Sequence, residues 1–378
     1  MLDIIRFSAA LVVLAGHVTV PGFRTGFPDQ HVIGEYAVPV FFVLSGFVIR
    51  FVTLSHEHTL RNFFIDRAAR MYSVVLPAMA LTLLIAGLCV LIDRPYYMQI
   101  WGPFSDHIFT RVVLNLTFLS QIWGHATIPL INGPFWSLSY ECMYYIAYGL
   151  LFYMRGWKRI VAILLWAAIA GPQIIFLLPI WWLGCWIYDL YQAIRGSALA
   201  NLLRGATLAY LILGVALFAA GKHAMLAAPF HLDLAFGTLP NLLDLVHIPS
   251  RRASMLAAGT GILAGVLMLF ALLLSDMVTL PQDSVWERRF RSIANGTFSI
   301  YLLHYPLLVL ATIVGLLAPH RWLLNITTST VIAVLLILLA HPLDLFKVII
   351  RTQLRRLPMQ LNPLTPAEQG SVRATKSA

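Results

Sequence analysis

Residues 4–20 read IIRFSAALVVLAGHVTV, an apolar stretch interrupted by Arg6 and His17. An ionisable side chain at membrane depth costs roughly 3 kcal/mol on insertion scales, so it faces a protein interior or a wet cavity. Eleven residues at about 100° each make three turns plus about 20°, which places both side chains on one helix face about 16 Å apart. The stretch therefore predicts a membrane helix that carries part of a functional site.

The composition extends this prediction to the whole chain. Of its 378 residues, 60% are hydrophobic and 11% are charged, whereas soluble domains carry about 25% charged residues. Apolar runs of about twenty residues recur, which is typical of a polytopic helical membrane protein. Their continuity argues against an outer-membrane barrel, whose strands alternate. We therefore expect an all-α integral membrane protein in contact with the lipid bilayer.

The net charge of +10 has a membrane explanation, because Lys and Arg residues in cytoplasmic loops set the orientation of such proteins. We therefore expect no nucleic-acid partner. The three cysteines all fall in apolar segments and suggest small buried side chains rather than disulfides or metal ligands. No pair of histidines has convincing zinc spacing, so no metal site is predicted.

Ten spans are expected along the chain. They lie at roughly 3–21, 34–54, 71–92, 134–154, 160–176, 178–193, 204–221, 254–276, 293–317 and 322–342. The segment 110–130 is ambiguous, because Asn115, Gln121 and His125 interrupt its apolar pattern. If this segment does not cross, 18 Lys and Arg residues lie on the side of the termini and 7 on the other side.

If the segment does cross, the charges of the two halves of the chain contradict each other under the positive-inside rule. We therefore expect about ten transmembrane helices with cytoplasmic N and C termini, and a re-entrant or surface helix at 110–130 on the outer side. The loop 222–253 is also expected outside. Residues 1–345 form the predicted membrane domain, and residues 346–378 form a tail that is first basic and then disordered.

A carboxylate is the second ionisable group expected within the membrane. The segment 133–149 reads GPFWSLSYECMYYIAYG, and Glu141 lies well inside the span that it opens. A buried carboxylate needs a partner. His17 is expected at a comparable depth, where Glu141 would fix its tautomer and raise its basicity. Structural pairing of Glu141 with an arginine is the alternative.

A basic cluster precedes the third span. The segment 61–72 reads RNFFIDRAARMY, in which Arg67 and Arg70 are three residues apart on one helix face and Arg61 lies nearby. Solvated charge of the positive-inside kind is the simplest explanation. The alternative is a phosphate clamp, because guanidinium groups bind phosphate oxygens bidentately.

Two further segments combine apolar and polar residues. The segment 39–51, PVFFVLSGFVIRF, contains a Ser-Gly step that allows a helix or a ligand to approach the backbone, and helix packing is the favoured interpretation. The segment 295–308, NGTFSIYLLHYPLL, places Tyr301 and His304 three residues apart on a helix. A buried structural histidine and a functional one are equally compatible with that pattern.

Together these motifs resemble the membrane acyltransferase-3 family of bacterial O-acyltransferases. The resemblance rests on Asp3-x-x-Arg6, His17, FFVLSGFVI, Arg67-x-x-Arg70, FWSLSYE and FSIYLLH, and it extends over residues 1–345. It implies a ten-helix domain in the bacterial cytoplasmic (inner) membrane. Such a domain transfers an acetyl or other acyl group from cytoplasmic acetyl-CoA to a hydroxyl of a surface or secreted glycan.

The resemblance also implies roles for individual residues. His17 would be the general base, with Glu141 and Arg6 completing the catalytic set, and Arg67, Arg70 and Arg61 would bind the CoA phosphates. Candidate acceptor contacts are Trp136, Ser137, Ser139, Tyr301 and His304. A proton-coupled transporter or flippase is the alternative function, because such carriers also use intramembrane Arg, His and Glu residues.

Overall fold

The computed structural model describes residues 2–27, 31–55, 59–205, 216, 251–276 and 296–357, and within these ranges the regular elements are all helices. The α-helices are α1 (Leu2–Val18), α2 (His31–Ser55), α3 (Leu60–Ile92), α4 (Arg94–Trp101), α5 (Ile108–Leu116), α6 (Trp136–Tyr153), α7 (Gly156–Ala170), α8 (Pro172–Ile194), α9 (Ala198–Gly205), α12 (Arg251–Ser275), α14 (Thr297–Ile313), α15 (Trp322–Leu338) and α16 (Ala340–Arg356). Three short 3₁₀ helices are η1 (Pro21–Phe23), η2 (Ile122–Gly124) and η3 (Gly133–Phe135). The expectation of an all-α protein is confirmed for the described residues.

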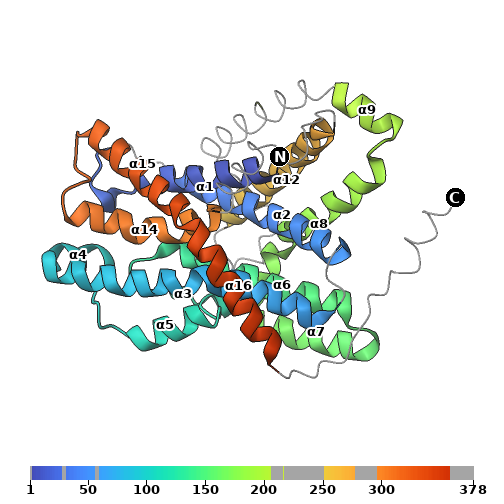
Figure 1. Ribbon diagram of the computed structural model, residues 1–378, viewed down its shortest axis with the longest axis horizontal. Helices are drawn as coiled ribbons and strands as arrows, with labels where there is room; N and C mark the ends of the chain where they lie inside the picture. The colour runs from blue at the N-terminus through green and yellow to red at the C-terminus, as the bar shows by residue number, and fades with distance from the viewer. Residues whose placement is uncertain are drawn as a thin grey trace, which may run out of the picture.

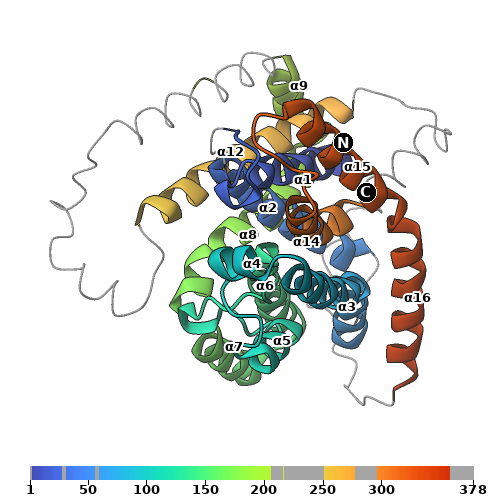
Figure 2. The same cartoon turned by 90° about the vertical axis from the view of Figure 1, so that its left-hand side faces the viewer.

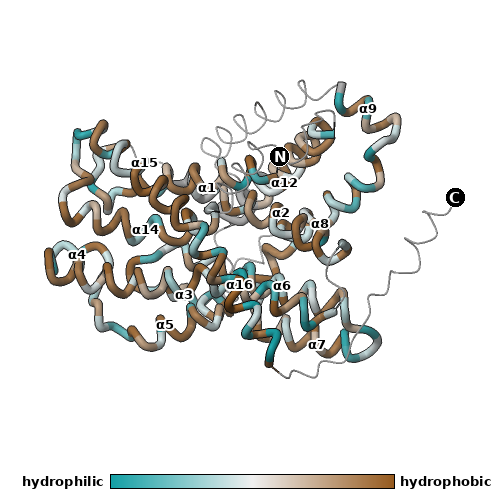
Figure 3. The backbone as a smooth tube through the Cα atoms, in the orientation of Figure 1, coloured by the Kyte–Doolittle hydropathy of each residue, from teal (hydrophilic) through white to brown (hydrophobic). Residues whose placement is uncertain are grey.

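Part of the helical bundle has the length and surface of membrane helices. Five stretches are long and apolar enough to cross a bilayer, namely Tyr36–Ser55, Leu60–Ile92, Pro172–Ile194, Ala258–Ser275 and Trp322–Arg356. Large apolar side chains cover the outside of the bundle, as in Leu91, which is 83% exposed, and Leu338, which is 68% exposed. Such a surface is suited to lipid rather than to water. Figure 3 shows apolar residues along most of the bundle and polar ones toward the end of α16.

Helices α2 and α8 cross with their backbones in contact. A Cβ built on Gly46 would lie 2.0 Å from the carbonyl oxygen of Trp181, and one built on Gly184 would lie 1.9 Å from that of Val43. Glycine at both positions lets the two backbones touch. The Sγ of Cys185 donates to the carbonyl of Gly46 at 3.3 Å across the same crossing. The packing interpretation of the Ser-Gly step is therefore confirmed.

Helices α1, α2, α3, α6 and α14 surround the centre of the bundle, and α1 and α14 lie near one another (Figure 1). The buried amide of Asn132, beside η3, ties two of its neighbours together. It donates to the hydroxyl of Thr82 on α3 and to the carbonyl of Leu302 on α14, both at 3.0 Å. These bonds fix the entry to α6 against α3 and α14, which carry Arg67, Arg70 and His304.

The segment 110–130 does not form a span. Its helix α5 has only nine residues, about half the length needed to cross a bilayer. The chain then folds back, because the Asn115 amide donates to the carbonyl of Thr127 at 3.1 Å. The hydroxyl of Ser139 on α6 donates to the carbonyl of Phe118 at 2.6 Å. The expected surface or re-entrant element is thus a short helix and loop fastened to α6.

The remaining helices follow the expected apolar runs, with shifts at their ends. Helix α3 starts at Leu60, eleven residues before the expected span, so the basic cluster lies within it. The span expected at 204–221 and the loop 222–253 lie almost entirely outside the described residues. The expected boundary between residues 345 and 346 falls inside α16, so the first part of the tail is helical; the rest of it lies outside the described residues.

Helix α16 packs beside α3 (Figure 2). Both oxygens of Asp66 on α3 are engaged by Arg351, at 2.6 and 2.5 Å, and Arg355 approaches Asp66 at 3.4 Å. Arg61 donates to the carbonyls of Arg355 and Leu357 at 2.8 Å each, at the end of the helix. These contacts hold the polar helix α16 against the start of α3.

Candidate active site

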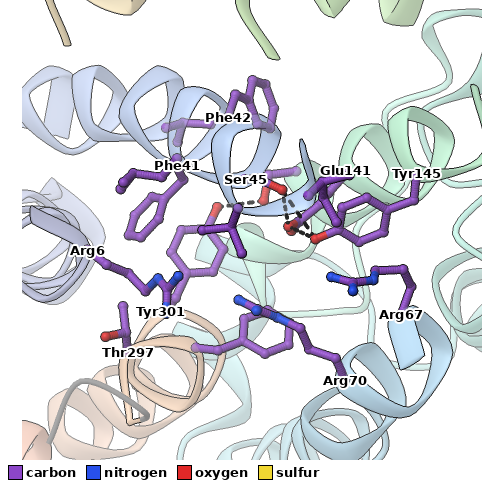
Figure 4. Close-up of a pocket in the computed structure, with 16 residues that line it drawn as sticks. Arg6, Phe41, Phe42, Ser45, Arg67, Arg70, Glu141, Tyr145, Thr297 and Tyr301 are labelled. Atoms are coloured by element: carbon purple, nitrogen blue, oxygen red, sulfur yellow. Dashed lines mark hydrogen bonds between the residues drawn. The ribbon is translucent and has the colours of Figure 1, made fainter. Parts of the chain in front are cut away.

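A cavity of about 60 Å³ opens between α1, α2, α3, α6 and α14 (Figure 4). It brings together residues that were predicted from segments up to 295 positions apart. Six of the sequence-predicted site residues line it, namely Arg6, Arg67, Arg70, Ser137, Glu141 and Tyr301. The aromatic rings of Phe41 and Phe42 form part of its wall.

The charged groups of this cavity are three arginines and one glutamate. Arg67 is only 8% exposed, and Arg6 keeps an ion pair with Asp3 at 3.6 Å. Three guanidinium groups facing one carboxylate leave an excess of positive charge at the cavity. A buried excess of positive charge favours an anionic ligand, and guanidinium forks match phosphate oxygens in particular.

Glu141 does not pair with His17, so the predicted contact between them is wrong. Its carboxylate accepts hydrogen bonds from the hydroxyls of Ser45, at 2.9 Å, and Tyr145. The alternative, pairing of Glu141 with an arginine, is not found among the described residues either, although Glu141 lines the same cavity as Arg6, Arg67 and Arg70. The sequence could not distinguish these partners, since equal depth in the membrane does not specify which helices are neighbours.

A second cavity adjoins the first on the side of α16. It has a volume of about 80 Å³, and Arg6, Arg70, Thr297 and Phe298 line both cavities. Its outer wall includes Lys347 of α16, which is paired with Asp344 at 2.6 Å. The two cavities together give the arginines access from the end of the bundle at which α1 and α14 begin.

His17 has a different partner, and that partner comes from α14. Nδ1 of His17 lies 2.8 Å from Nε2 of His304, and the two rings stack with their centroids 5.0 Å apart. His304 is fully buried, and its Nδ1 lies 2.7 Å from the carbonyl oxygen of Ile300. Tyr305 packs its ring edge against His17, with centroids 5.1 Å apart. Sequence analysis identified both histidines but not their contact.

The hydrogen bonds of this pair define the tautomers of its neutral form. A carbonyl oxygen can only accept, so Nδ1 of His304 carries the proton and its Nε2 carries a lone pair. His17 then donates from its own Nδ1, which leaves the lone pair of its imidazole on Nε2. This arrangement suits a ring that accepts a proton at Nε2, with the resulting positive charge shared along the bonds to His304 and Ile300.

Tyr301 lies between the arginine cavity and the histidine pair. It stands one turn before His304 on α14, and its hydroxyl is 2.7 Å from that of Ser137. Its ring packs against Phe41 with centroids 5.3 Å apart. The two predicted acceptor contacts Ser137 and Tyr301 therefore come together at the inner wall of the cavity.

Three other predicted site residues have different surroundings. Arg61 binds the end of α16, as described above, and neither cavity includes it. Ser139 is fully buried and bonds to the backbone of the loop after α5. Trp136 packs edge-on against Tyr140, with centroids 5.4 Å apart. All three fasten the bundle rather than line the arginine cavity.

Sequence analysis missed Ser45, Tyr145, Thr297 and Tyr305 as site residues. Ser45 was seen only as part of a packing step, yet its hydroxyl reaches Glu141. Tyr145 follows Glu141 by four residues, a spacing that places two side chains on one helix face and could have identified it. Nothing in the sequence indicates the contact of Tyr305 with His17.

The family of the chain is shown by its similarity to known proteins. A family model described as an acyltransferase domain matches residues 1–341. The chain belongs to the membrane acyltransferase-3 family. Family membership thus confirms the resemblance that the sequence motifs indicate, over nearly the whole length of the described helices.

Two relatives of the chain carry names that agree with this family. Over 177 residues the chain is 30% identical to the acyltransferase MdmB of Streptomyces mycarofaciens. The aligned region covers 44% of this chain and 42% of the relative. Over 198 residues it is 25% identical to the O-acetyl transferase of Shigella phage Sf6. That aligned region covers 47% of this chain and 56% of the relative. The chain thus spans about half the length of the curated relatives it matches. No solved structure matches it.

Proposed function

We propose that this protein is an O-acyltransferase of a bacterial cytoplasmic membrane. It transfers an acyl group, most simply acetyl, from acyl-CoA to a hydroxyl of a surface or secreted glycan. The observation that carries this proposal is the relation between the two polar sites. Arg6 and His17 stand on α1 while Phe298 and His304 stand on α14, so the same two helices connect an arginine cavity to a histidine pair.

The arginine cavity is suited to the CoA part of the donor. CoA carries a diphosphate and a further phosphate, so it presents several negative charges to Arg6, Arg67 and Arg70. In this role Glu141, held by Ser45 and Tyr145, adds one negative charge to the cavity and so offsets part of the repulsion among the three guanidinium groups. Lys347 at the rim of the adjoining cavity adds one more positive group along the route inward.

The histidine pair is suited to activate the acceptor. Nε2 of His17 takes the proton of the acceptor hydroxyl while the oxygen attacks the thioester carbonyl carbon. The carbon–sulfur bond then breaks, and the CoA thiolate leaves and takes up the proton from His17. His304 is a positioning residue in this step, because its bond to Ile300 fixes the tautomer of His17. Transfer is direct, with no acyl-enzyme.

The membrane arrangement that this function needs has ten spans with both termini on the cytoplasmic side. The Lys and Arg distribution supports it, because the basic residues of α16 and the arginine cavity then lie on the side where acyl-CoA is made. One of the ten spans, the one expected at 204–221, falls almost entirely outside the described residues. The histidine pair and the segment 94–132 then face the outer half of the membrane.

Purified protein and acetyl-CoA test the function directly. Release of the CoA thiol is measured for the unchanged protein, for His17→Ala and for Arg70→Ala, together with the KM for acetyl-CoA. We expect thiol release in the unchanged protein, its loss in His17→Ala, and a raised KM in Arg70→Ala. Full activity of His17→Ala would overturn the catalytic assignment. Absence of any thiol release, with acyl-independent movement of a glycan across vesicles, would favour a transporter.

A further inference from the structure

A third cavity lies at the end of the bundle formed by α4 and α5. It has a volume of about 480 Å³, within the usual range for small-molecule sites, and is far larger than either cavity around the arginines. Its walls come from the end of α4, the start of α5 and the loop that folds back at 126–130. In Figure 1 these elements lie at the left end of the molecule. None of the residues assigned above lines it.

The walls of this outer cavity combine apolar and polar groups. Trp101, Ile128 and Leu130 supply its apolar part, and Thr110 and Arg111 supply polar groups. The charge of Arg111 is already balanced, because Asp106 approaches it at 3.4 Å. The indole face of Trp101, beside the hydroxyl of Thr110 and the imidazole of His107, suits a ligand with both C–H faces and hydroxyl edges. An uncharged sugar has that chemistry.

One wall of the outer cavity adjoins the catalytic region. The side chain of Trp101 lies next to Tyr305, and Tyr305 packs its ring edge on His17, with centroids 5.1 Å apart. Trp101 therefore lies two contacts away from the proposed general base.

The region behind Trp101 is tightly fastened. The Tyr96 hydroxyl on α4 donates to the carbonyl of Gly22, in the turn directly after α1. A Cβ built on Gly22 would lie 3.1 Å from the side chain of Ile100. Phe23 of the same turn packs on Tyr305, with centroids 5.1 Å apart. These contacts fix the position of the cavity relative to the end of α1, which carries His17.

We propose that the outer cavity is the acceptor site, and that it takes an uncharged sugar unit whose ring stacks on Trp101. The proposal rests on the proposed acyltransferase function and adds the place and the chemical class of the second substrate. The donor then enters past the arginines, the acceptor enters between α4 and α5, and the two meet at His17. The separation explains how one chain keeps substrates from different compartments apart until they react.

Filling the cavity tests the proposal. Thr110→Trp and Ala126→Trp each place an indole in it from a different wall, at side chains that are exposed. Phe109→Trp is the matched control, because Phe109 is 79% exposed on the same helix and does not line the cavity. Ester-linked acetate on polysaccharide is measured by mild alkaline release from cells that express each variant. The purified variants are assayed for thiol release from acetyl-CoA without acceptor.

We expect both cavity variants to lower polysaccharide-bound acetate at least about tenfold, with KM for acetyl-CoA and acceptor-independent thiol release unchanged. The Phe109→Trp control should match the unchanged protein in every assay. Undiminished polysaccharide acetate in both cavity variants overturns the acceptor site, and acetate found on lipid or protein instead overturns the sugar class. A parent protein that releases no thiol from acetyl-CoA overturns the proposed function itself, which is a separate result.

Discussion

Nδ1 of His17 and Nε2 of His304 lie 2.8 Å apart, although 287 residues separate them in the chain. The contact joins the end of α1 to the middle of α14 and gives His17 a fixed tautomer. Glu141, the partner that depth in the membrane suggested, instead bonds Ser45 and Tyr145. A buried imidazole can orient a second imidazole without adding a charge.

The first prediction concerns the role of His304 as a positioning residue. His304→Leu removes both hydrogen bonds and should lower kcat by roughly 10²-fold, with the KM for acetyl-CoA nearly unchanged. His304→Gln retains a donor and an acceptor on one side chain, so it should recover part of the loss. Steady-state thiol release from acetyl-CoA measures both parameters. Equal activity of the Leu and Gln variants would mean that hydrogen bonding at this position has no part in catalysis.

The second prediction concerns donor binding. Arg70→Ala should raise the KM for acetyl-CoA roughly 10- to 100-fold, because one charge-assisted hydrogen bond to phosphate contributes about 1.5–3 kcal/mol. The kcat should change little, since the phosphates stay bound to the enzyme throughout the step. Arg159→Ala is the control, because Arg159 is exposed at the start of α7. A KM that rises equally in the control would indicate general surface attraction instead of a site.

The third prediction separates the two roles considered for Glu141. Glu141→Gln keeps an oxygen acceptor for Ser45 and Tyr145 but removes the carboxylate that lines the cavity together with the three arginines. We expect a lower thermal stability, by roughly 1–3 kcal/mol, and an unchanged or lower KM for acetyl-CoA. Thermal unfolding in detergent and steady-state kinetics measure these effects. A large fall in kcat with normal stability would instead support the catalytic partnership with His17 that sequence analysis predicted.

The fourth prediction concerns the crossing of α2 and α8. Gly46→Ala and Gly184→Ala each force a methyl group into the backbone of the facing helix, and overpacking of this kind typically costs 1–3 kcal/mol or more. Gly87→Ala is the control, because nothing lies within 4 Å of a Cβ built at that helical position. Alanine there should be neutral or stabilising by up to about 1 kcal/mol. Thermal unfolding measures the stability of the three variants. Equal stabilities would contradict the close contact of the α2 and α8 backbones.

The fifth prediction concerns the attachment of α16. Asp66→Ala removes the carboxylate that holds Arg351 and Arg355, so amide hydrogen exchange in residues 340–356 should become faster. Asp344→Ala is the control, because it breaks only the pair with Lys347 inside α16. That pair is exposed and contributes a few tenths of a kcal/mol. Equal exchange rates in both variants would show that Asp66 does not anchor the helix.

Sequence analysis predicted most of the helices, because lipid imposes a long apolar run on each one and those runs can be read directly. Lys and Arg counts also led correctly to 110–130 as a segment that does not cross, as the nine residues of α5 show. The start of α3 was placed eleven residues late. Its first turns carry Arg61, Asp66, Arg67 and Arg70. A hydropathy pattern ends at such charged residues, whereas the helix continues through them because other helices supply their partners.

The sequence by itself determined which ionisable side chains lie inside apolar runs, where an arginine, a histidine or a glutamate needs a polar environment supplied by the protein. It therefore identified Arg6, His17, Glu141 and His304. Only the tertiary structure decided which of them meet. Helices of equal length and depth can be neighbours in many arrangements, and it is the close crossing at Gly46 and Gly184 and the buried amide of Asn132 that select one. In that arrangement the carboxylate joins the arginines, and the two histidines join each other.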